Sequence, residues 1–199
     1  MPPALAPLVL ASASPRRAEL LAEAGLEFET SPAQLDERAE PGEAPGQTCR
    51  RLAAAKAAAS AAGRRTGTVL GGDTLIEHEG RLLGKPRDEA DASVMLSALA
   101  GRRNRVWSAV ALLHAPTGLA LDGLEGADVE LLPLSADWLP SYLESGEWRD
   151  KAGAYAIQGR AASFARLVEG ELDTVVGLPR RLLADLLARL AASVENAPR

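Results

Sequence analysis

Residues 8–25 contain a strand that leads directly into a helix, and this pair constrains the fold more than any other stretch of the chain. The sequence is LVLASASPRRAELLAEAG, and its short apolar start is typical of a buried strand. Ser14 and Pro15 predict a helix start, with Ser14 as the cap and Pro15 at the first helical position. Gly25 predicts the end of this helix. We therefore expect a strand that ends at a helix N-terminus.

The first turn of this helix carries two positive charges at the end where acidic residues are favoured. Arg16 and Arg17 lie at the positive end of the helix dipole, so a negative group is expected to offset them. The hydroxyls of Ser12 and Ser14, the free backbone N–H groups and the two guanidinium groups suit a phosphate chain. Alternatively, both arginines point into solvent and Ser-Pro only starts a helix. On this segment alone both interpretations stay open.

The composition limits the classes of protein and ligand. With 199 residues, of which 47% are hydrophobic, the chain can bury a core as one domain or as one domain with two lobes. The formal net charge of -5 argues against a general nucleic-acid binder or a binder of acidic membranes. A phosphate site then has to be local, made of a few Lys and Arg residues, and its ligand has to be small.

The cysteine count and the N-terminal sequence bear on the compartment. Cys49 is the only cysteine, which excludes an internal disulfide and a cysteine-based metal site within one chain. No apolar run approaches the roughly 18 residues that span a membrane, and the N-terminus lacks the pattern of an export signal. We expect a cytoplasmic protein with no membrane or nucleic-acid partner.

An acidic loop and an alanine-rich helix follow. Residues 31–46 are rich in Pro, Gly and acidic residues, which predicts a surface loop. Its carboxylates, Glu37 among them, are usually solvated and in a minority of cases act as metal ligands or bases. Residues 47–62 predict a helix with Lys56 in the middle, and a lysine among alanines is more often exposed or snorkelling than a ligand.

A strand with two glycines carries a candidate catalytic carboxylate. Residues 68–76, TVLGGDTLI, predict a strand that Gly71-Gly72 interrupts before Asp73, because such glycines often mark a bulge or the close approach of a ligand. A turn at Glu79-Gly80 and a return arm at residues 81–83 predict a hairpin that brings Lys85 back towards Asp73. The two charges form either a structural ion pair or a site, and we favour a site.

The remaining elements are predicted from periodicity and turn residues. Helices are expected from an Asp88 cap to residue 100 and from a Ser135 cap to residue 143, and VVGLP at residues 175–179 predicts the start of the last helix. Strands are expected at residues 103–113, 119–134 and 164–168. Residues 150–159, DKAGAYAIQG, fit neither pattern and predict a functional loop. Residues 196–199 are expected to be a disordered tail.

Several enzyme classes are disfavoured by the motifs that the sequence lacks. It contains no GxxxxGK[ST], GxGxxG or GxSxG, so a P-loop, a Rossmann phosphate site and a serine hydrolase are not supported. His78 and His114, the only histidines, have neither metal-ligand nor triad spacing.

The chain resembles the Maf family of nucleoside triphosphate pyrophosphatases, in particular the subgroup that acts on dTTP and UTP. The resemblance rests on motifs in the family's order and spacing over nearly the whole chain: SASPRR with ELL, RLAAAKA, GGDT, LGKP, LAGR, DKAGAYAIQG and VVGLP. Each motif alone is weak, but together they are specific.

The resemblance implies a fold and a reaction. The fold is α/β, with a mixed, twisted β-sheet flanked by helices and two lobes around a central cleft, similar to inosine triphosphate pyrophosphatases, over residues 1–195. The implied enzyme is cytoplasmic, a hydrolase of phosphoric anhydrides that needs a divalent metal cation, Mg²⁺ or Mn²⁺, and cleaves a nucleoside triphosphate to the monophosphate and pyrophosphate. A homodimer is implied by the resemblance alone.

The resemblance also assigns site residues by motif. Asp73 matches the proposed proton acceptor, and Glu37 and Asp73 are hypothesised to bear on the metal. The matched phosphate-site residues are Ser12, Arg16, Arg17, Lys56 and Lys85. The chemistry is coherent, because triphosphate hydrolysis needs neutralised phosphoryl oxygens and a positioned water.

Base preference is expected to follow Arg16, Thr74 and Gln158, which resemble the dTTP and UTP subgroup rather than the 7-methyl-GTP subgroup. A glutamine amide can donate to O4 and accept from N3–H of uracil or thymine, whereas a positively charged methylated guanine calls for a carboxylate. Three departures from the family pattern put the exact base preference in doubt: Gly72, Ala127 and Ala156.

Two alternative functions stay open at this point. One is a pyrophosphatase for modified or non-standard nucleotides, and the other is a regulator of septum formation that acts by binding a division protein.

Overall fold

The computed structural model describes residues 1–135 and 137–196, so most of the expected disordered tail lies outside the described residues. The chain divides into two compact units, each described by itself below. The first unit contains Met1–Asp73, Ser108–Glu125 and the residues from Gly177 onward, and the second contains Thr74–Trp107 and Gly126–Val176. Within the described ranges, no helix is both long and apolar enough to cross a bilayer.

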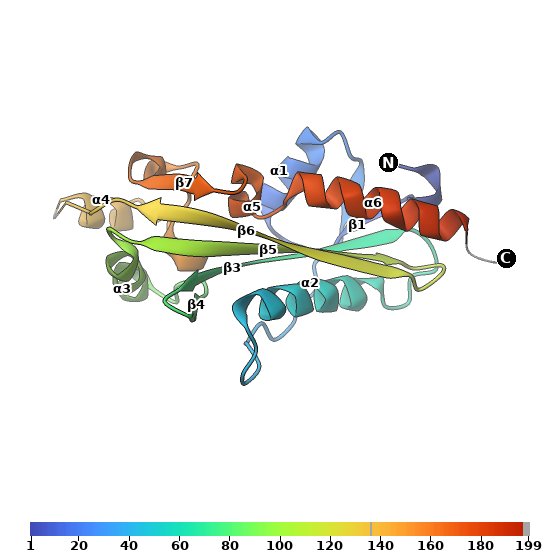
Figure 1. Ribbon diagram of the computed structural model, residues 1–199, viewed down its shortest axis with the longest axis horizontal. Coiled ribbons are helices and arrows are strands. Elements are labelled where there is room, and N and C mark those ends of the chain that lie inside the picture. The colour runs from blue at the N-terminus through green and yellow to red at the C-terminus, as the bar shows by residue number, and fades with distance from the viewer. Residues whose placement is uncertain (136, 197–199) are drawn as a thin grey trace. The chain divides into compact units, whose positions relative to one another are not determined.

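The described residues form the mixed α/β structure that was expected (Figure 1). The sheet has seven strands in the order β2-β1-β3-β5-β6-β7, and β4 pairs with β3. The strands are β1 (Leu8–Leu10), β2 (Phe28–Thr30), β3 (Thr68–His78), β4 (Arg81–Leu83), β5 (Arg103–His114), β6 (Ala120–Leu131) and β7 (Ala165–Glu169). The α-helices are α1 (Pro15–Glu23), α2 (Pro45–Ala61), α3 (Glu89–Leu99), α4 (Trp138–Glu144), α5 (Leu172–Val176) and α6 (Arg180–Glu195).

In the first unit, β1 feeds α1 as the sequence predicts. Strand β1 is fully buried and runs parallel to both β2 and β3, with Leu8 opposite Phe28 and Thr68. Helix α1 begins at Pro15. Ser14 occupies the cap position, but its side chain makes no capping bond, and its backbone N–H instead donates to Ser12 Oγ at 3.2 Å. The Ser12 hydroxyl is thereby held at the N-terminus of α1.

The glycines of β3 do not interrupt the strand, so that prediction is wrong. Strand β3 runs without a break from Thr68 to His78, and Gly71 instead lets helix α2 lie against it. A Cβ atom at Gly71 would overlap the carbonyl oxygen of Ala53 and lie 2.7 Å from the backbone nitrogen of Ala57. The glycine therefore serves a close approach of helix and strand.

Helix α6 supplies the other large apolar surface of the first unit. It buries Leu183, Leu186, Leu187 and Leu190, which recur at the three- and four-residue spacing of one helix face. Its expected start at VVGLP is wrong, because Val176 ends α5 and α6 starts only at Arg180. Gly177 has φ +122°, which no helix can accommodate, and Pro179 takes the position before α6.

The second unit has its own apolar core. Ile76, Leu96, Val106 and Val129 are buried in it, and Trp138, Tyr142 and Phe164 form an aromatic group whose ring centroids lie 3.9 to 6.0 Å apart. The hairpin of β3 and β4 has the predicted turn, with positive φ at both Glu79 and Gly80. Asp88 caps α3 as predicted, because its side chain accepts from the N–H of Asp91 at 2.8 Å.

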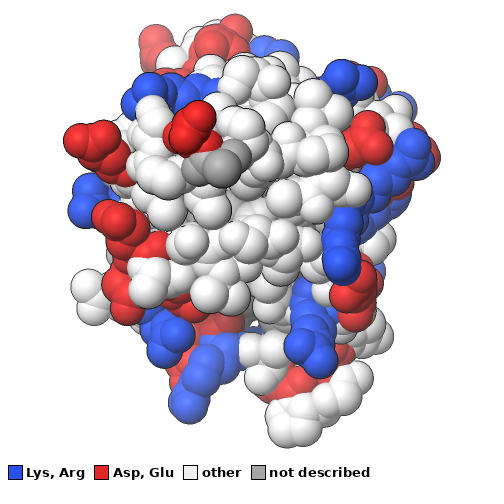
Figure 2. Space-filling view, turned by 90° about the vertical axis from the view of Figure 1, so that its left-hand side faces the viewer, with Lys and Arg blue, Asp and Glu red and all other residues white. Residues whose placement is uncertain are grey.

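Helix α4 does not have the predicted cap. The helix begins at Trp138 after Asp137, and it is the backbone oxygen of Ser135, not its hydroxyl, that accepts from the N–H of Trp138. Among the described residues drawn in Figure 2, a broad central area of this end of the molecule shows no charged side chain. Val94 of α3 is an exposed apolar side chain of the second unit, 69% exposed.

Residues 150–159 form an irregular but well-tied segment, as expected for DKAGAYAIQG. A short 3₁₀ turn, η2 (Ala152–Ala154), is buried at Gly153 and Ala154. The N–H of Gly153 donates to the carbonyl of Gly84 at 3.0 Å, and the Tyr155 hydroxyl donates to Asn104 Oδ1 at 3.0 Å. The LGKP and DKAGAYAIQG motifs therefore lie together within the second unit.

We predict that Gly71→Ala destabilises the protein by about 1–3 kcal/mol, since the added methyl group forces α2 away from β3. Urea unfolding measures the change. Gly84→Ala is the matched control, because a Cβ atom there meets nothing within 4 Å and its free energy of unfolding should stay within about 0.5 kcal/mol of the parent. Equal midpoints for the two variants would contradict the close-packing explanation.

Candidate active site

The buried side chain of Lys56 lies between two carboxylates in the first unit. Its Nζ donates to Asp73 Oδ1 and to Glu37 Oε1, each at 2.6 Å. Lys56 is 9% exposed and Asp73 6% exposed, so the interpretation of Lys56 as an exposed lysine is wrong. A buried ammonium group is tolerated only when it is paired, and here it binds two carboxylates that the sequence separates by 36 positions.

Small residues on α2 explain how Lys56 reaches this position. Ala53 and Ala57, the neighbours of Lys56 on the buried face of α2, bring the helix onto β3 at Gly71. Asp73 follows Gly71 by two positions, which places both on the same face of the strand. The lysine and the carboxylate therefore meet because the helix packs closely against the strand.

One carboxylate oxygen of Asp73 makes no hydrogen bond to the residues that the structure describes. In the described part of the chain, Asp73 Oδ2 is buried and has no hydrogen-bond partner, whereas Oδ1 is held by Lys56. A buried carboxylate oxygen without a partner costs free energy in the folded protein, and functional sites are a common reason for retaining such a group. The unpaired oxygen indicates where a ligand of the site would be bound.

Arg17 reaches the same region from α1. Its Nε donates to the carbonyl of Gly177 at 2.9 Å and its Nη1 to Ser12 Oγ at 3.1 Å, so the interpretation that it points into solvent is wrong. Burial lowers the pKa of the Arg17 guanidinium from its ordinary value, while the charge of Asp73 opposes this effect. A Cβ atom at Gly72 would lie 3.0 Å from Arg17 Nε, so this glycine leaves room for the arginine beside β3. Arg16 lies partly buried in the same helical turn.

Cys49 is a neighbour of the site that the sequence interpretation missed. Its thiol donates to the backbone oxygen of Asp73 at 3.4 Å, and burial together with the charge of Asp73 raises the pKa of the thiol to about 12. The thiol therefore stays protonated and holds the backbone of Asp73. Cys49 and Lys56 are seven residues apart on one helix, about two turns, and this spacing predicts a shared face.

A second missed group consists of Arg51 and Glu43. Arg51 donates twice to the carboxylate of Glu43, at 2.8 Å from both Nε and Nη2, and Nη2 also donates to the backbone oxygen of Arg38 at 3.0 Å. Glu43 also accepts from the hydroxyl of Thr48 at 2.9 Å. The hydrogen bonds from Arg51, partly opposed by burial, lower the pKa of Glu43 to about 2.

The other candidate residues belong to the second unit. Thr74 follows Asp73 on β3 and is partly buried, Lys85 is exposed after β4, and Gln158 is exposed in the turn after η2. The structure thus brings Ser12, Arg17, Glu37, Lys56 and Asp73 into one connected group within the first unit. The parts assigned to the remaining candidates stay predictions.

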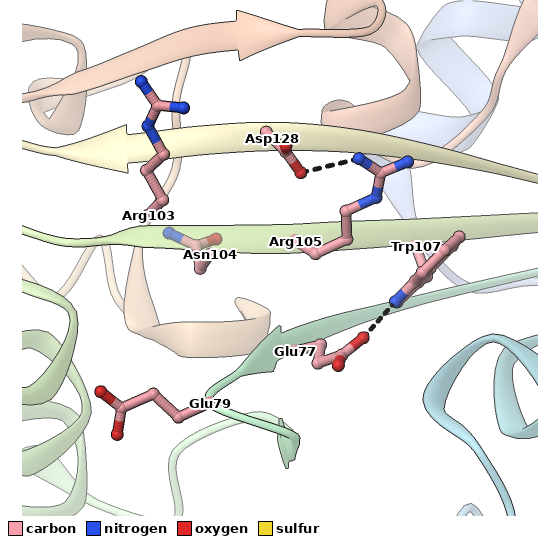
Figure 3. Close-up of a pocket in the computed structure, with 7 residues that line it drawn as sticks. All are labelled: Glu77, Glu79, Arg103, Asn104, Arg105, Trp107 and Asp128. Carbon is pink, nitrogen blue, oxygen red and sulfur yellow. Dashed lines mark hydrogen bonds and ion pairs between the residues drawn. The ribbon is translucent and has the colours of Figure 1, made fainter.

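A hollow on the second unit is a distinct feature that contains none of the predicted site residues (Figure 3). Arg105 binds Asp128 at 2.9 Å, and the indole N–H of Trp107 donates to Glu77 at 2.8 Å. Figure 3 shows the side chains of Arg103 and Glu79 pointing away from these pairs. The carboxylates of Asp128 and Glu77 thus have partners here, whereas Asp73 Oδ2 has none among the described residues.

The donor set around Lys56 is of the kind that suits a hard cation. Carboxylate oxygens are what Mg²⁺ prefers, and Asp73 Oδ2 is such an oxygen without a partner. Residues 1–135 and 137–196 contain no group of three or more His, Cys, Asp or Glu side chains that could enclose a metal ion. A cation bound by Asp73 and Glu37 would take its other ligands from water or substrate, which is the usual arrangement for Mg²⁺.

The fold and these side chains define an α/β protein with a strongly charged site beside a helix N-terminus, the type of site that binds phosphate groups. The comparisons identify the family. The model for the Maf-like proteins matches residues 7–190, and the chain belongs to the Maf family.

Curated relatives agree over nearly their whole length. The chain is 46% identical to a dTTP/UTP pyrophosphatase of Moorella thermoacetica, covering 94% of this chain and 96% of the relative. It is 45% identical to a dTTP/UTP pyrophosphatase of Burkholderia lata, covering 96% and 97%. The solved structure of the Staphylococcus aureus Ham1 protein has a similar fold, with a TM-score of 0.50 and 14% identity over 94% of this chain and 98% of that one.

We predict that the stabilising effect of Glu43 depends on pH in a defined direction. Because its pKa in the folded protein, about 2, lies below the ordinary 4.5, its contribution is complete above pH 4.5 and is lost as the pH falls towards 2. The free energy of unfolding of Glu43→Gln, measured in urea at each pH, should differ from that of the parent most above pH 4.5, and the gap should shrink at lower pH. A gap that stayed constant from neutral pH down to pH 2 would contradict the ion pair.

Proposed function

We propose that this chain hydrolyses dTTP and UTP to the nucleoside monophosphate and pyrophosphate. Membership of the Maf family and the names of the relatives support the reaction. The single observation in the structure that supports it best is the buried Asp73, held by Lys56 through one oxygen and unpaired at the other. Such an arrangement suits a carboxylate that orients a water molecule or accepts its proton.

The cationic side chains are the reason for proposing a triphosphate as the substrate. Cleavage between the α- and β-phosphates places charge on the oxygens of the α-phosphorus and on the leaving pyrophosphate. Arg16, Arg17 and Lys56 would offset this charge, together with Lys85 of the second unit. Ser12 would add a hydroxyl beside the free N–H groups of α1.

A divalent cation, Mg²⁺ or Mn²⁺, is proposed as the cofactor, with Glu37 as a direct protein ligand and Asp73 bearing on it through a coordinated water. When bound, such an ion supplies charge neutralisation on the phosphates and lowers the pKa of a coordinated water. Asp73 Oδ2 would face this water, because Oδ1 is engaged by Lys56. Lys56 keeps the carboxylate in one orientation, so proton transfer to Asp73 needs no rotation of the side chain.

The base preference is proposed to rest on Gln158, with Thr74 and Arg16. An amide both donates and accepts, which matches O4 and N3–H of uracil and thymine. The homodimer and the cytoplasmic location that the family resemblance implies stay predictions.

We predict that Asp73→Asn lowers kcat for dTTP by roughly 10²- to 10⁴-fold, because the amide cannot accept a proton from water. Release of pyrophosphate from a panel of ribo- and deoxyribonucleoside triphosphates, including the inosine and 7-methyl-guanosine forms, measures this in Mg²⁺ and in Mn²⁺. Circular dichroism controls for folding, and a chelator should abolish the parent activity. Near-parent turnover of a folded Asp73→Asn variant would refute the assignment.

We predict that Gln158→Glu lowers kcat/KM for dTTP and UTP by about 10- to 100-fold, since a carboxylate cannot donate to O4 and repels it. Hydrolysis of 7-methyl-GTP should fall less or rise. Gln34→Glu is the matched control, because it makes the same chemical change at an exposed loop position. An equal loss for all bases in Gln158→Glu would assign this residue to something other than base recognition.

A further inference from the structure

The segment that carries Glu37 needs something to hold it in place. Residues 31–40 form neither helix nor strand, and the Glu37 side chain is 51% exposed although it binds the buried Lys56. Fixing the backbone of an irregular segment costs conformational entropy at every residue, and one ion pair that is open to solvent on one side offsets little of it. Further contacts must fix the position of Glu37.

Arg51 makes these contacts from the neighbouring turns of the same helix that carries Lys56. Its guanidinium group donates two hydrogen bonds of 2.8 Å to the carboxylate of Glu43, which we call the grip of Arg51. It also donates at 3.0 Å to the backbone oxygen of Arg38, the residue after Glu37. It also lies 3.6 Å from the carboxylate of Glu40. One side chain therefore ties the segment at three positions between Glu37 and the start of α2.

The hydrogen-bonded pair of Arg51 and Glu43 is partly shielded from water and is held by further contacts. Arg51 is 31% exposed and Glu43 12% exposed, so both side chains are partly shielded from water. The hydrogen bonds from Arg51 lower the pKa of Glu43 to about 2, which agrees with a carboxylate held in its charged form. Its Oε2 further accepts from the Thr48 hydroxyl and from the N–H of Glu40 at 3.2 Å.

We propose that Arg51 is a positioning residue of the site, which holds residues 38–43 against α2 so that Glu37 stays on Lys56. The inference rests on the proposed function for its catalytic consequence, and on the contacts alone for its structural part. Arginine is required because a lysine ammonium cannot grip both oxygens of Glu43 and also reach the carbonyl of Arg38 in a fixed plane.

Arg50 offers a matched control on the adjacent position. It binds Asp122 of β6, and no side-chain hydrogen bond or ion pair joins Arg50 to residues 36–43 in the described part of the chain. Arg50→Gln and Arg51→Gln remove the same charge, the same side-chain type and one trypsin site each from the same helix. Only the second change releases the segment that carries Glu37.

Limited trypsin digestion tests the structural part without any activity. Cleavage after Arg38, identified by mass, should be at least about tenfold faster in Arg51→Gln than in Arg50→Gln, the change expected for the loss of a charge-assisted hydrogen bond. Arg51→Lys should resemble Arg51→Gln. Glu43→Gln opens the same grip from the other side and should do likewise if Arg51→Gln folds poorly. Equal cleavage rates in Arg50→Gln and in the folded grip variants would overturn the proposal.

Kinetics test the catalytic consequence. Arg51→Gln should lower kcat for dTTP at least about tenfold and raise the Mg²⁺ concentration at half-maximal rate, while Arg50→Gln changes both less than about twofold. If Arg51 acts through Glu37, the pair Glu37→Gln/Arg51→Gln should lose no more than Glu37→Gln alone. Fully additive losses would overturn the positioning role. An inactive parent enzyme would instead refute the proposed function, and the trypsin comparison would still decide whether Arg51 holds the segment.

Discussion

The ammonium group of Lys56 is the contact on which the first unit's site depends. It joins helix α2, strand β3 and the irregular segment before α2, since Asp73 and Glu37 both accept from it at 2.6 Å. Removing the Lys56 ammonium group and the Asp73 carboxylate from water is costly, and their pairing offsets that cost, whereas Glu37 stays half exposed. Because Asp73 Oδ2 gains nothing from this pairing, the group is arranged for something other than stability alone.

The contact of Lys56 with Asp73 in turn depends on glycine and alanine at the positions where α2 and Arg17 lie against β3. Gly71 lets α2 approach β3, Ala53 and Ala57 complete the close packing, and Gly72 leaves room for Arg17 on the strand. Residues that look like interruptions of secondary structure thus set the distances between charged groups. Cys49 adds a hydrogen bond to the backbone of Asp73 from the same helix, so the carboxylate is fixed through both its side chain and its main chain.

Local signals in the sequence predicted what depends on neighbours in the chain. The start of α1 at Pro15, the cap of α3 at Asp88 and the turn at Glu79-Gly80 are each fixed by a few adjacent residues, and all three predictions are confirmed. The burial of Lys56 and the grip of Arg51 on Glu43 were not predicted, because both depend on which face of α2 meets β3 and on the path of a loop. An alanine-rich helix with charges on several sides does not reveal either. The predicted helix start at VVGLP was wrong for a different reason. The positive φ of Gly177 follows the end of α5, and α6 begins only after Pro179.

The balance of charge at the site is the reason why a cation belongs to the proposed function. Arg17 and Lys56 bring two positive charges to the first unit's site and Glu37 and Asp73 two negative ones, and Arg16 would add a third positive charge if it takes the part predicted for it. A triphosphate would add several more negative charges than this small excess can offset, and carboxylates beside phosphates repel them. Under the proposed function, the two carboxylates would bear on a divalent ion that arrives with the substrate, as Mg²⁺ commonly does with phosphates. On this view the two carboxylates are fixed by different means: Lys56 and Cys49 hold Asp73 from helix α2, and Arg51 holds the residues after Glu37 against the same helix so that Glu37 stays on Lys56.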